Sequence, residues 1–291
     1  MLTGGSGRLN RVSSTVLYPE GCSVPSMDEV RAHHFTFLTR DSPPIIATCG
    51  GRGVFGSSFK KDCLVLRDGQ WKGGELGDLP DEREYSASAR LNDGVFLLGG
   101  KLTPSSSVFL RANSRSWVSG PGLPVAMMLG PCAAPIGSHS FLIVYGTNVY
   151  EFDTRVAGPT DDAGWRPKEN WPQLRVNRRN LGCGLLKKML VVAGGRDSGG
   201  NYLKSTEIIN LVTKTISFGA EMEKKREHFH LLSIDGNLFA LGGFYYDGDY
   251  HYPADVEEFV EETGTWKPAK SLDGKRGWYG GVAVTRDLVC G

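Results

Sequence analysis

The chain has 291 residues, 39 of them glycine, and its 33 basic and 32 acidic side chains leave a formal net charge of +1. A charge this close to zero gives no electrostatic argument for binding nucleic acid or an anionic membrane surface. No apolar run approaches the roughly 20 residues of a membrane span, and the first residues lack the layout of a signal peptide. We therefore expect one globular domain over residues 1–291, with neither nucleic acid nor membrane as partner.

A glycine pair at the end of a short apolar run recurs along the chain. The pairs are Gly4-Gly5, Gly50-Gly51, Gly99-Gly100, Gly194-Gly195 and Gly242-Gly243, with degraded copies at Gly146 and at the last residue, Gly291. The first glycines follow one another at intervals of 46, 49, 47, 48, 48 and 49 residues. A period in this range is typical of propeller blades.

Taken in chain order, the predicted elements begin with residues 13–24, which we expect to supply the third and fourth strands of a blade. Five complete blades follow between residues 29 and 277. In the clearest unit, residues 85–91, 95–98 and 108–110 are three short strands, and Trp117 opens a fourth. Turn signals such as Asn92-Asp93-Gly94 separate consecutive strands, so each unit is predicted to be a four-stranded antiparallel meander.

The two ends of the chain are expected to meet in one blade. Residues 278–291 would supply its first two strands and residues 13–24 its last two, which removes the open edges of the ring. The prediction is an all-β, six-bladed propeller. A chain that stops inside its repeat motif is also typical of a piece of a longer protein.

Further residues recur with the glycine pairs. Tryptophan follows the first glycine by 18 to 24 residues at Trp71, Trp117, Trp165 and Trp266, and arginine precedes it by 15 or 16 at Arg83, Arg178, Arg226 and Arg276. This pattern resembles the kelch repeat, and we expect these residues to be framework that packs between blades. Three units depart from it and are predicted to be less regular: Gly146 lacks the second glycine, Ile216 stands where tryptophan is expected, and the first unit also lacks the tryptophan.

Propeller geometry brings two sets of residues to one mouth of the ring, because the second strand returns to the face from which the first strand sets out. After the glycine pairs the chain has Arg52, Lys101, Arg196, Phe244 and Tyr245; opening the first strands it has His33, His34, Tyr85, Cys132, Asn180, His228 and Trp278. The resemblance to Kelch-like adaptors implies a binding module that takes acidic or turn-shaped peptides at this mouth, as the substrate-recognition part of a ubiquitin-ligase adaptor or as a scaffold. Arginine and lysine would hold carboxylates there, and the aromatic rings would stack.

The alternative is a kelch-fold enzyme, either a copper radical oxidase or a carbohydrate-active enzyme. Tyr250-His251 is the one dipeptide similar to a copper radical site. A sugar isomerase or hydrolase would need a carboxylate beside a base in the channel, and the first strands are almost free of acidic residues there. We therefore assign no catalytic residue, metal or cofactor. The aromatic segment from Tyr245 to Ala254 is interpreted as a contact loop.

The six cysteines allow two readings of the compartment. Cys132 and Cys183 are expected to pack as free apolar side chains on inner strands. A cytoplasmic, reduced and monomeric ring is the main expectation. The alternative is a secreted chain in which a disulfide joins Cys49 and Cys63, which lie on neighbouring strands of one blade.

Overall fold

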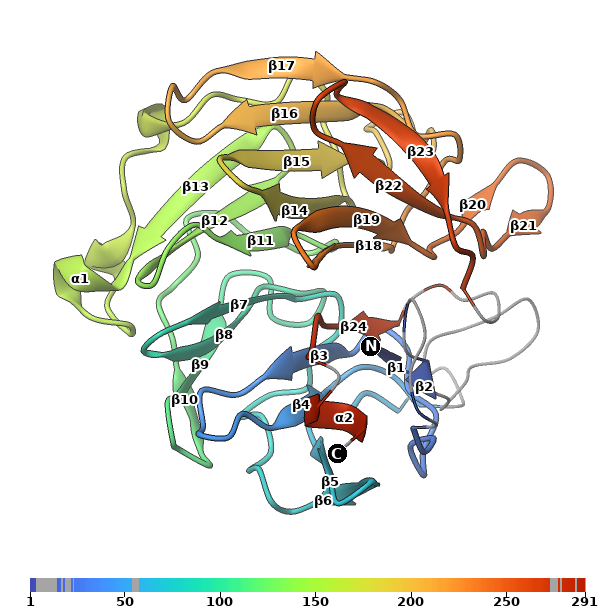
Figure 1. Cartoon of the computed structure of the whole chain (residues 1–291). Helices are drawn as coiled ribbons and strands as arrows, with labels where there is room; N and C mark the ends of the chain where they lie inside the picture. The colour runs from blue at the N-terminus through green and yellow to red at the C-terminus, as the bar shows by residue number, and fades with distance from the viewer. Residues whose placement is uncertain are drawn as a thin grey trace.

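The computed structural model describes residues 1–3, 15–16, 18, 22, 24–53, 58–272, 277, 279–285 and 287–290. Nearly all of its regular structure is antiparallel strand, arranged as separate sheets around a ring (Figure 1). The first strands of the sheets contact one another in sequence, β3 with β7, β7 with β11, β11 with β14 and β14 with β18, and β24 returns to β3. Between the last and the first of these sheets, Nε2 of His230 in β18 lies 2.9 Å from the carbonyl oxygen of Tyr279, just before β24. The ring is therefore closed, and the sheets are the blades of an all-β propeller.

Four blades have four strands each. The first contains β3 (Phe35–Leu38), β4 (Ile46–Cys49), β5 (Cys63–Arg67) and β6 (Gln70–Gly73), and the second contains β7 (Ala87–Leu91), β8 (Gly94–Leu98), β9 (Ser107–Arg111) and β10 (Trp117–Ser119). The fourth contains β14 (Gly182–Leu186), β15 (Met189–Ala193), β16 (Thr206–Asn210) and β17 (Ile216–Gly219). The fifth contains β18 (His230–Ile234), β19 (Asn237–Leu241), β22 (Val256–Val260) and β23 (Thr265–Ala269), with the hairpin β20 (Tyr245–Tyr246) and β21 (Tyr250–His251) inserted after β19.

The third blade is irregular, as its degraded glycine motif predicts. It has three strands, β11 (Cys132–Pro135), β12 (Ser140–Tyr145) and β13 (Asn148–Asp153), followed by α1 (Thr154–Ala157), η1 (Asp162–Gly164) and η2 (Lys168–Asn170). Trp165 reaches the sheet only through an isolated bridge to Phe152. The prediction of an irregular blade was wrong for the fourth blade, which has four regular strands. Ile216 pairs with Ile209 and packs in the same apolar cluster, so this blade does not need a tryptophan there.

The chain ends do share a sheet, but its strands differ from those expected. The order is β2 (Thr15–Val16), β1 (Leu2–Thr3) and β24 (Gly280–Gly281), so β1 lies beside β24 (Figure 1). Residues 287–290, expected in a strand, form the helix α2 (Asp287–Cys290). The physical reason is that Leu2-Thr3 also has the sequence of a second strand, since it precedes a glycine pair. It pairs with β24 at the edge where residues 288–289 were expected.

The described residues therefore form five blades, and the predicted count of six is not confirmed. The terminal sheet has three strands of two residues each in the part of the chain that the structure describes. It closes the ring between the fifth and first blades without forming a four-stranded blade there.

The core lies between the blades, because each sheet has an apolar neighbour on both faces. All five residues of β8 are buried, as are the first five of β12. Trp117, at the start of β10, is 7% exposed and meets Phe37 of the first blade edge-on at 5.8 Å. The tryptophans thus fill the wedge between blades, as the repeat pattern indicates.

In the part of the chain that the structure describes, a buried arginine joins each glycine pair to the adjoining loop. Nη1 donates to the carbonyl oxygen of the first glycine at 2.7 to 3.2 Å in the pairs Arg31–Gly50, Arg83–Gly99, Arg178–Gly194 and Arg226–Gly242. In two pairs the second glycine binds the next arginine along the chain: the N–H of Gly51 donates to the carbonyl of Arg83 at 2.7 Å, and that of Gly195 to the carbonyl of Arg226 at 2.8 Å. Gly50 and Gly51 have φ of +67° and +86°, which only glycine adopts readily. These arginines are framework; Arg276 lies outside the described residues.

Two disulfides correct the cysteine predictions. Cys49 and Cys63 face each other across β4 and β5 and are bonded, as in the secreted alternative. Cys132 and Cys183 were expected to be free, but they form a disulfide between the first strands of the third and fourth blades. The two first strands lie close enough for this because neighbouring inner strands converge at the ring axis, and the two Cα atoms are 5.8 Å apart.

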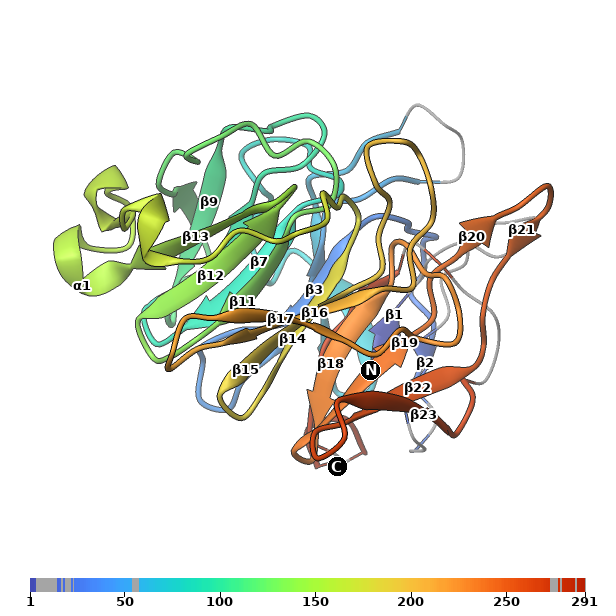
Figure 2. The same ribbon diagram turned by 90° about the horizontal axis from the view of Figure 1, so that it is seen from above.

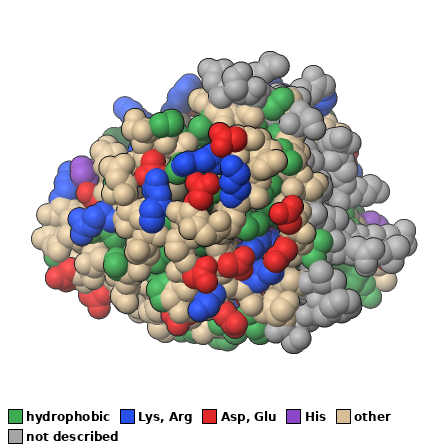
Figure 3. Space-filling model, turned by 90° about the horizontal axis from the view of Figure 1, so that it is seen from below, with side chains coloured by type: hydrophobic (Ala, Val, Ile, Leu, Met, Phe, Trp, Pro, Cys, Tyr) green, Lys and Arg blue, Asp and Glu red, His purple; other side chains and the backbone are tan. Residues whose placement is uncertain are grey.

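The outer surface carries both signs of charge. On the face in Figure 3, Lys and Arg side chains are interspersed with Asp and Glu and gather into no large patch of one sign. The two α-helices in the described residues have four residues each, too few to cross a bilayer.

Candidate functional site at the mouth of the channel

Five residues at equivalent positions open the first strands of the five blades. All have a left-handed backbone, with φ between +49° and +63°: His33, Tyr85, Gly130, Asn180 and His228. Four of the five are not glycine, and left-handed backbone in such residues is held by its surroundings and concentrates at functional sites. Tyr85, Asn180 and His228 lie where the sequence places them. Of the expected pair His33 and His34, it is His33 that holds the left-handed position, and Gly130 holds the position expected for Cys132. Trp278 lies outside the described residues.

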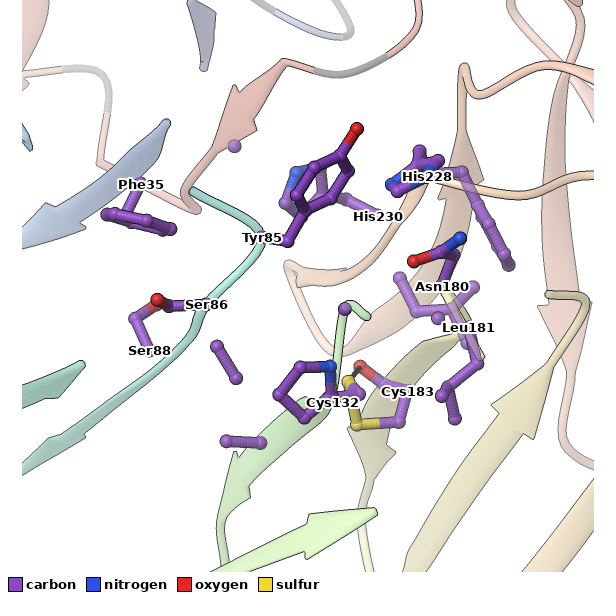
Figure 4. A pocket seen from close by; sticks show the side chains of 18 of the residues that line it. Phe35, Tyr85, Ser86, Ser88, Cys132, Asn180, Leu181, Cys183, His228 and His230 are labelled. Carbon is purple, nitrogen blue, oxygen red and sulfur yellow. Dashed lines mark hydrogen bonds between the residues drawn. A yellow bond between two sulfur atoms is a disulfide. The ribbon is translucent and has the colours of Figure 1, made fainter. Parts of the chain in front are cut away.

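Three of these residues form an aromatic cluster over the channel. The ring of Tyr85 is 4.1 Å from that of His33 and 5.0 Å from that of His228, and the phenolic oxygen of Tyr85 is 3.2 Å from Nε2 of His33. Figure 4 shows Tyr85 and His228 facing each other above the pocket. Burial, and next the nearby His230, lowers the pKa of His228 to about 3, so this ring is neutral at physiological pH.

Three residues that follow glycine pairs lie beside the left-handed positions. Arg52, Arg196 and Phe244 form equivalent bridges to Ala32, Arg179 and Glu227, the residues just before the left-handed positions. The guanidinium of Arg52 lies over the ring of Phe59, and that of Arg196 over Tyr202, each at 4.7 Å. The aromatic rings hold both cations in place.

Lys101 and Tyr245 lie on the same side of the ring but are less constrained. The N–H of Lys101 donates to the carbonyl of Glu84, and its side chain is 44% exposed. Tyr245 begins the hairpin β20–β21 and stacks on His251, with ring centroids 4.6 Å apart.

Two buried glutamates at the mouth were missed in the sequence. Glu84 is fully buried, 3.9 Å from Nε of Arg52 and 3.6 Å from Nζ of Lys101, and neither carboxylate oxygen has a hydrogen-bond donor among the described residues. Glu227 accepts a hydrogen bond from Nδ2 of Asn180 at 3.2 Å, and burial raises its pKa. Both glutamates precede the first strands, and the described residues that line the channel include no acid, as expected. A signal existed: both glutamates directly follow the recurrent arginines Arg83 and Arg226.

Below the mouth, the first strands enclose a cavity of about 230 Å³. His34, expected at the mouth, points instead into this channel wall, where Nε2 is 2.9 Å from Oγ1 of Thr3 and accepts from the N–H of Gly280 at 3.2 Å. Burial lowers its pKa to about 3. The Cys132–Cys183 disulfide lies in the same wall (Figure 4).

Cations outnumber acids at this mouth. Arg52, Lys101, Arg179 and Arg196 surround the two glutamates, of which Glu227 has a raised pKa. Among the described residues no group of three or more His, Cys, Asp or Glu side chains converges as metal ligands would. The arrangement can hold an anionic group against aromatic rings.

The comparisons with known proteins concern the fold. No family model matches the chain. A 63-residue segment, 22% of the chain, is 33% identical to Kelch-like protein 8 of Mus musculus and spans 10% of that relative's length. The solved structure of YjhT superposes with a TM-score of 0.66 over 88% of each chain, at 11% identity.

The chain is a kelch-repeat β-propeller. The likeness to YjhT concerns the fold alone, because identity is low, whereas the segment shared with Kelch-like protein 8 also matches in sequence. In this kelch propeller the glycine pairs and buried arginines account for the repeat, and the mouth residues are what differs from blade to blade.

Proposed function

We propose that the protein is a binding module that holds acidic, turn-shaped peptide segments at the mouth of the channel, as an adaptor or scaffold does. The observation that carries the proposal is the set of Arg52, Lys101 and Arg196 around the aromatic cluster of Tyr85 and His228. Converging cations bind carboxylates through charge-assisted hydrogen bonds, and rings held by their neighbours lose little entropy on binding.

The two buried glutamates limit the positive charge that a ligand would meet at the mouth. Glu84 lies between Arg52 and Lys101 and partly neutralises them, and Arg179 and Arg196 face Glu227. The mouth therefore keeps a modest net positive charge rather than three free cations. A ligand with two carboxylates on a tight turn matches that charge, because donors fixed in space favour acceptors held at a fixed spacing.

The test is a charge-removal variant, Arg52→Gln with Arg196→Gln, measured against a fluorescent cyclic peptide that carries two glutamates. Glutamine avoids placing a new carboxylate beside buried Glu84. Each lost charge-assisted bond is worth about 1.5–3 kcal/mol, so binding should weaken by about 100-fold or more.

The matched control is Lys187→Gln, whose side chain is 67% exposed at the opposite end of β14, where it pairs with Glu261. This variant should bind the peptide as the wild type does. Equal affinity in all three proteins would place recognition on another surface.

One observation favours an enzyme as a second candidate. A buried carboxyl with a raised pKa, Glu227, lies beside Asn180 and next to His228, an arrangement that suits a general acid at a channel mouth. A carbohydrate-active form is tested by incubating the protein with a panel of reducing sugars and glycosides and following them by NMR. Turnover that Glu227→Gln abolishes would support the enzyme. If no sugar is turned over, the carbohydrate-active enzyme is contradicted and the binding module is retained.

We also propose that the protein works in an oxidising compartment. The Cys49–Cys63 and Cys132–Cys183 disulfides support this, because such bonds persist outside the reducing cytosol.

A further inference from the structure

The hairpin β20–β21 projects from the fifth blade (Figure 2). It is inserted between β19 and β22 and is not needed to complete the four-stranded sheet. In its two strands, Tyr245 pairs with His251 and Tyr246 pairs with Tyr250. A two-stranded hairpin with aromatic cross-strand pairs presents one set of rings on each face.

One face of the hairpin carries four packed aromatic rings. Tyr246 and Tyr250 are 5.0 Å apart, Tyr250 is 5.9 Å from Phe244, and Phe244 is 6.1 Å from Tyr252. Phe244 and Tyr252 are buried at its base, while Tyr246 and Tyr250 are 47% and 49% exposed. Half of each outer ring is therefore open to a ligand.

The opposite face braces the hairpin. The rings of Tyr245 and His251 stack with centroids 4.6 Å apart and planes 9° apart, and Nε2 of His251 is 2.7 Å from a carboxylate oxygen of Asp247. These contacts hold the strands together without Tyr246 and Tyr250. The outer rings of the aromatic face are thus available for binding, and a braced surface loses less entropy when a partner binds.

The aromatic face continues into the mouth. Phe244 stacks on His228 with centroids 5.8 Å apart and planes 5° apart, and His228 belongs to the cluster over the channel. From His228 through Phe244 and Tyr250 to Tyr246, the ring steps are 5.8, 5.9 and 5.0 Å. An extended peptide advances roughly 3.3 Å per residue, so about five residues span this path.

We propose that this aromatic face, formed by Phe244, Tyr246, Tyr250 and Tyr252, is a second subsite that binds a proline or other apolar residue of the same peptide whose acidic turn lies at the mouth. The inference rests on the proposed function. Continuity with the mouth identifies the ligand, because one chain can occupy both subsites. The planes of Tyr246 and Tyr250 meet at 55°, which makes a notch for a compact apolar side chain rather than a flat platform for a sugar ring.

The experiment uses two linear peptides that share a two-glutamate turn. One carries proline five residues from the turn, and the other carries serine at that position. Their affinities are measured for the wild type and for Tyr246→Ala with Tyr250→Ala. The matched control is Phe218→Ala, an aromatic residue that is 54% exposed on β17 of another blade. A neutral oligosaccharide panel is measured beside the peptides.

The expected result is that the wild type and the Phe218 control bind the proline peptide about tenfold more tightly than the serine peptide, and that the tyrosine variant binds both equally. If serine and proline peptides bind the wild type alike, the subsite is overturned while the mouth proposal stands. If neither peptide binds, both proposals fail. Binding of an oligosaccharide that the tyrosine variant loses would overturn the peptide as ligand.

Discussion

Arg226 shows how single residues hold this ring together. Its guanidinium is fully buried, donates to Gly242 and to Asp255 through their carbonyls, and pairs with Glu257 at 3.0 Å. We predict that Arg226→Leu lowers the free energy of unfolding by about 3–5 kcal/mol, because it leaves a buried carboxylate without its cation. Urea unfolding measures this. Adding Glu257→Leu should restore part of the loss, and a double variant no better than the single one would contradict the ion-pair explanation.

His228 gives a prediction on pH. Its pKa is about 3 in the folded chain and about 6.5 when unfolded, so between these values the unfolded state binds more protons. Stability should therefore fall on acidification, by about 2 kcal/mol for this residue between pH 7.5 and 5.0. Glu227, with its raised pKa, acts in the opposite direction. Urea unfolding at both pH values should show a shallower dependence in His228→Gln; an unchanged dependence would contradict the burial of a neutral ring.

Residues differ in how far the sequence predicts them. The arginines at a fixed distance before the glycines could be assigned to the framework, because the spacing repeats. Tyr85, Asn180 and His228 followed from blade geometry. Glu84 and the exact left-handed positions did not, because a shift of one residue in a loop leaves the repeat spacing unchanged while moving a side chain between mouth and channel, as it does for His33 and His34.

At the scale of elements, ring closure depends on β24. A Cβ on Gly280 would lie 2.2 Å from Oγ1 of Thr36 and 2.9 Å from the ring of His34, so β24 fits between β1 and the first blade only with glycine. We predict that Gly280→Ala lowers the free energy of unfolding by about 1–3 kcal/mol, as overpacking does. Thermal melting measures this. Gly137→Ala is the control, since a Cβ there meets no atom within 4 Å and φ is not positive; equal effects would contradict the closure.

The elements also show where repeat reasoning ends. Strand order and pairing within the blades follow from the glycine period and the turn signals. The terminal sheet does not, because two copies of the second-strand motif, at residues 2–3 and 288–289, compete for one edge of β24. Sequence alone does not rank them, and in the structure the N-terminal copy takes the edge.

At the scale of the whole molecule, one disulfide ties separate blades together. Cys132–Cys183 closes a loop of 51 residues between the third and fourth blades, whereas Cys49–Cys63 closes 14 residues within one blade. Loop-entropy reasoning gives about 4 and 3 kcal/mol, so Cys132→Ser with Cys183→Ser should destabilise the ring more than Cys49→Ser with Cys63→Ser. Chemical unfolding of the two variants checks the order, and mass spectrometry without reductant checks that the bonds form. Free thiols at these positions in protein produced in an oxidising compartment would contradict both.

The central claim is that the mouth recognises carboxylates on a turn, and a pair of cyclic peptides that differ only by two Glu→Gln changes tests it most directly. Their dissociation constants for the wild-type propeller are measured at low and at high salt. We predict that the glutamate peptide binds at least about 100-fold more tightly at low salt and that the difference narrows as salt screens the attraction. Equal affinity of the two peptides, unaffected by salt, would contradict the account.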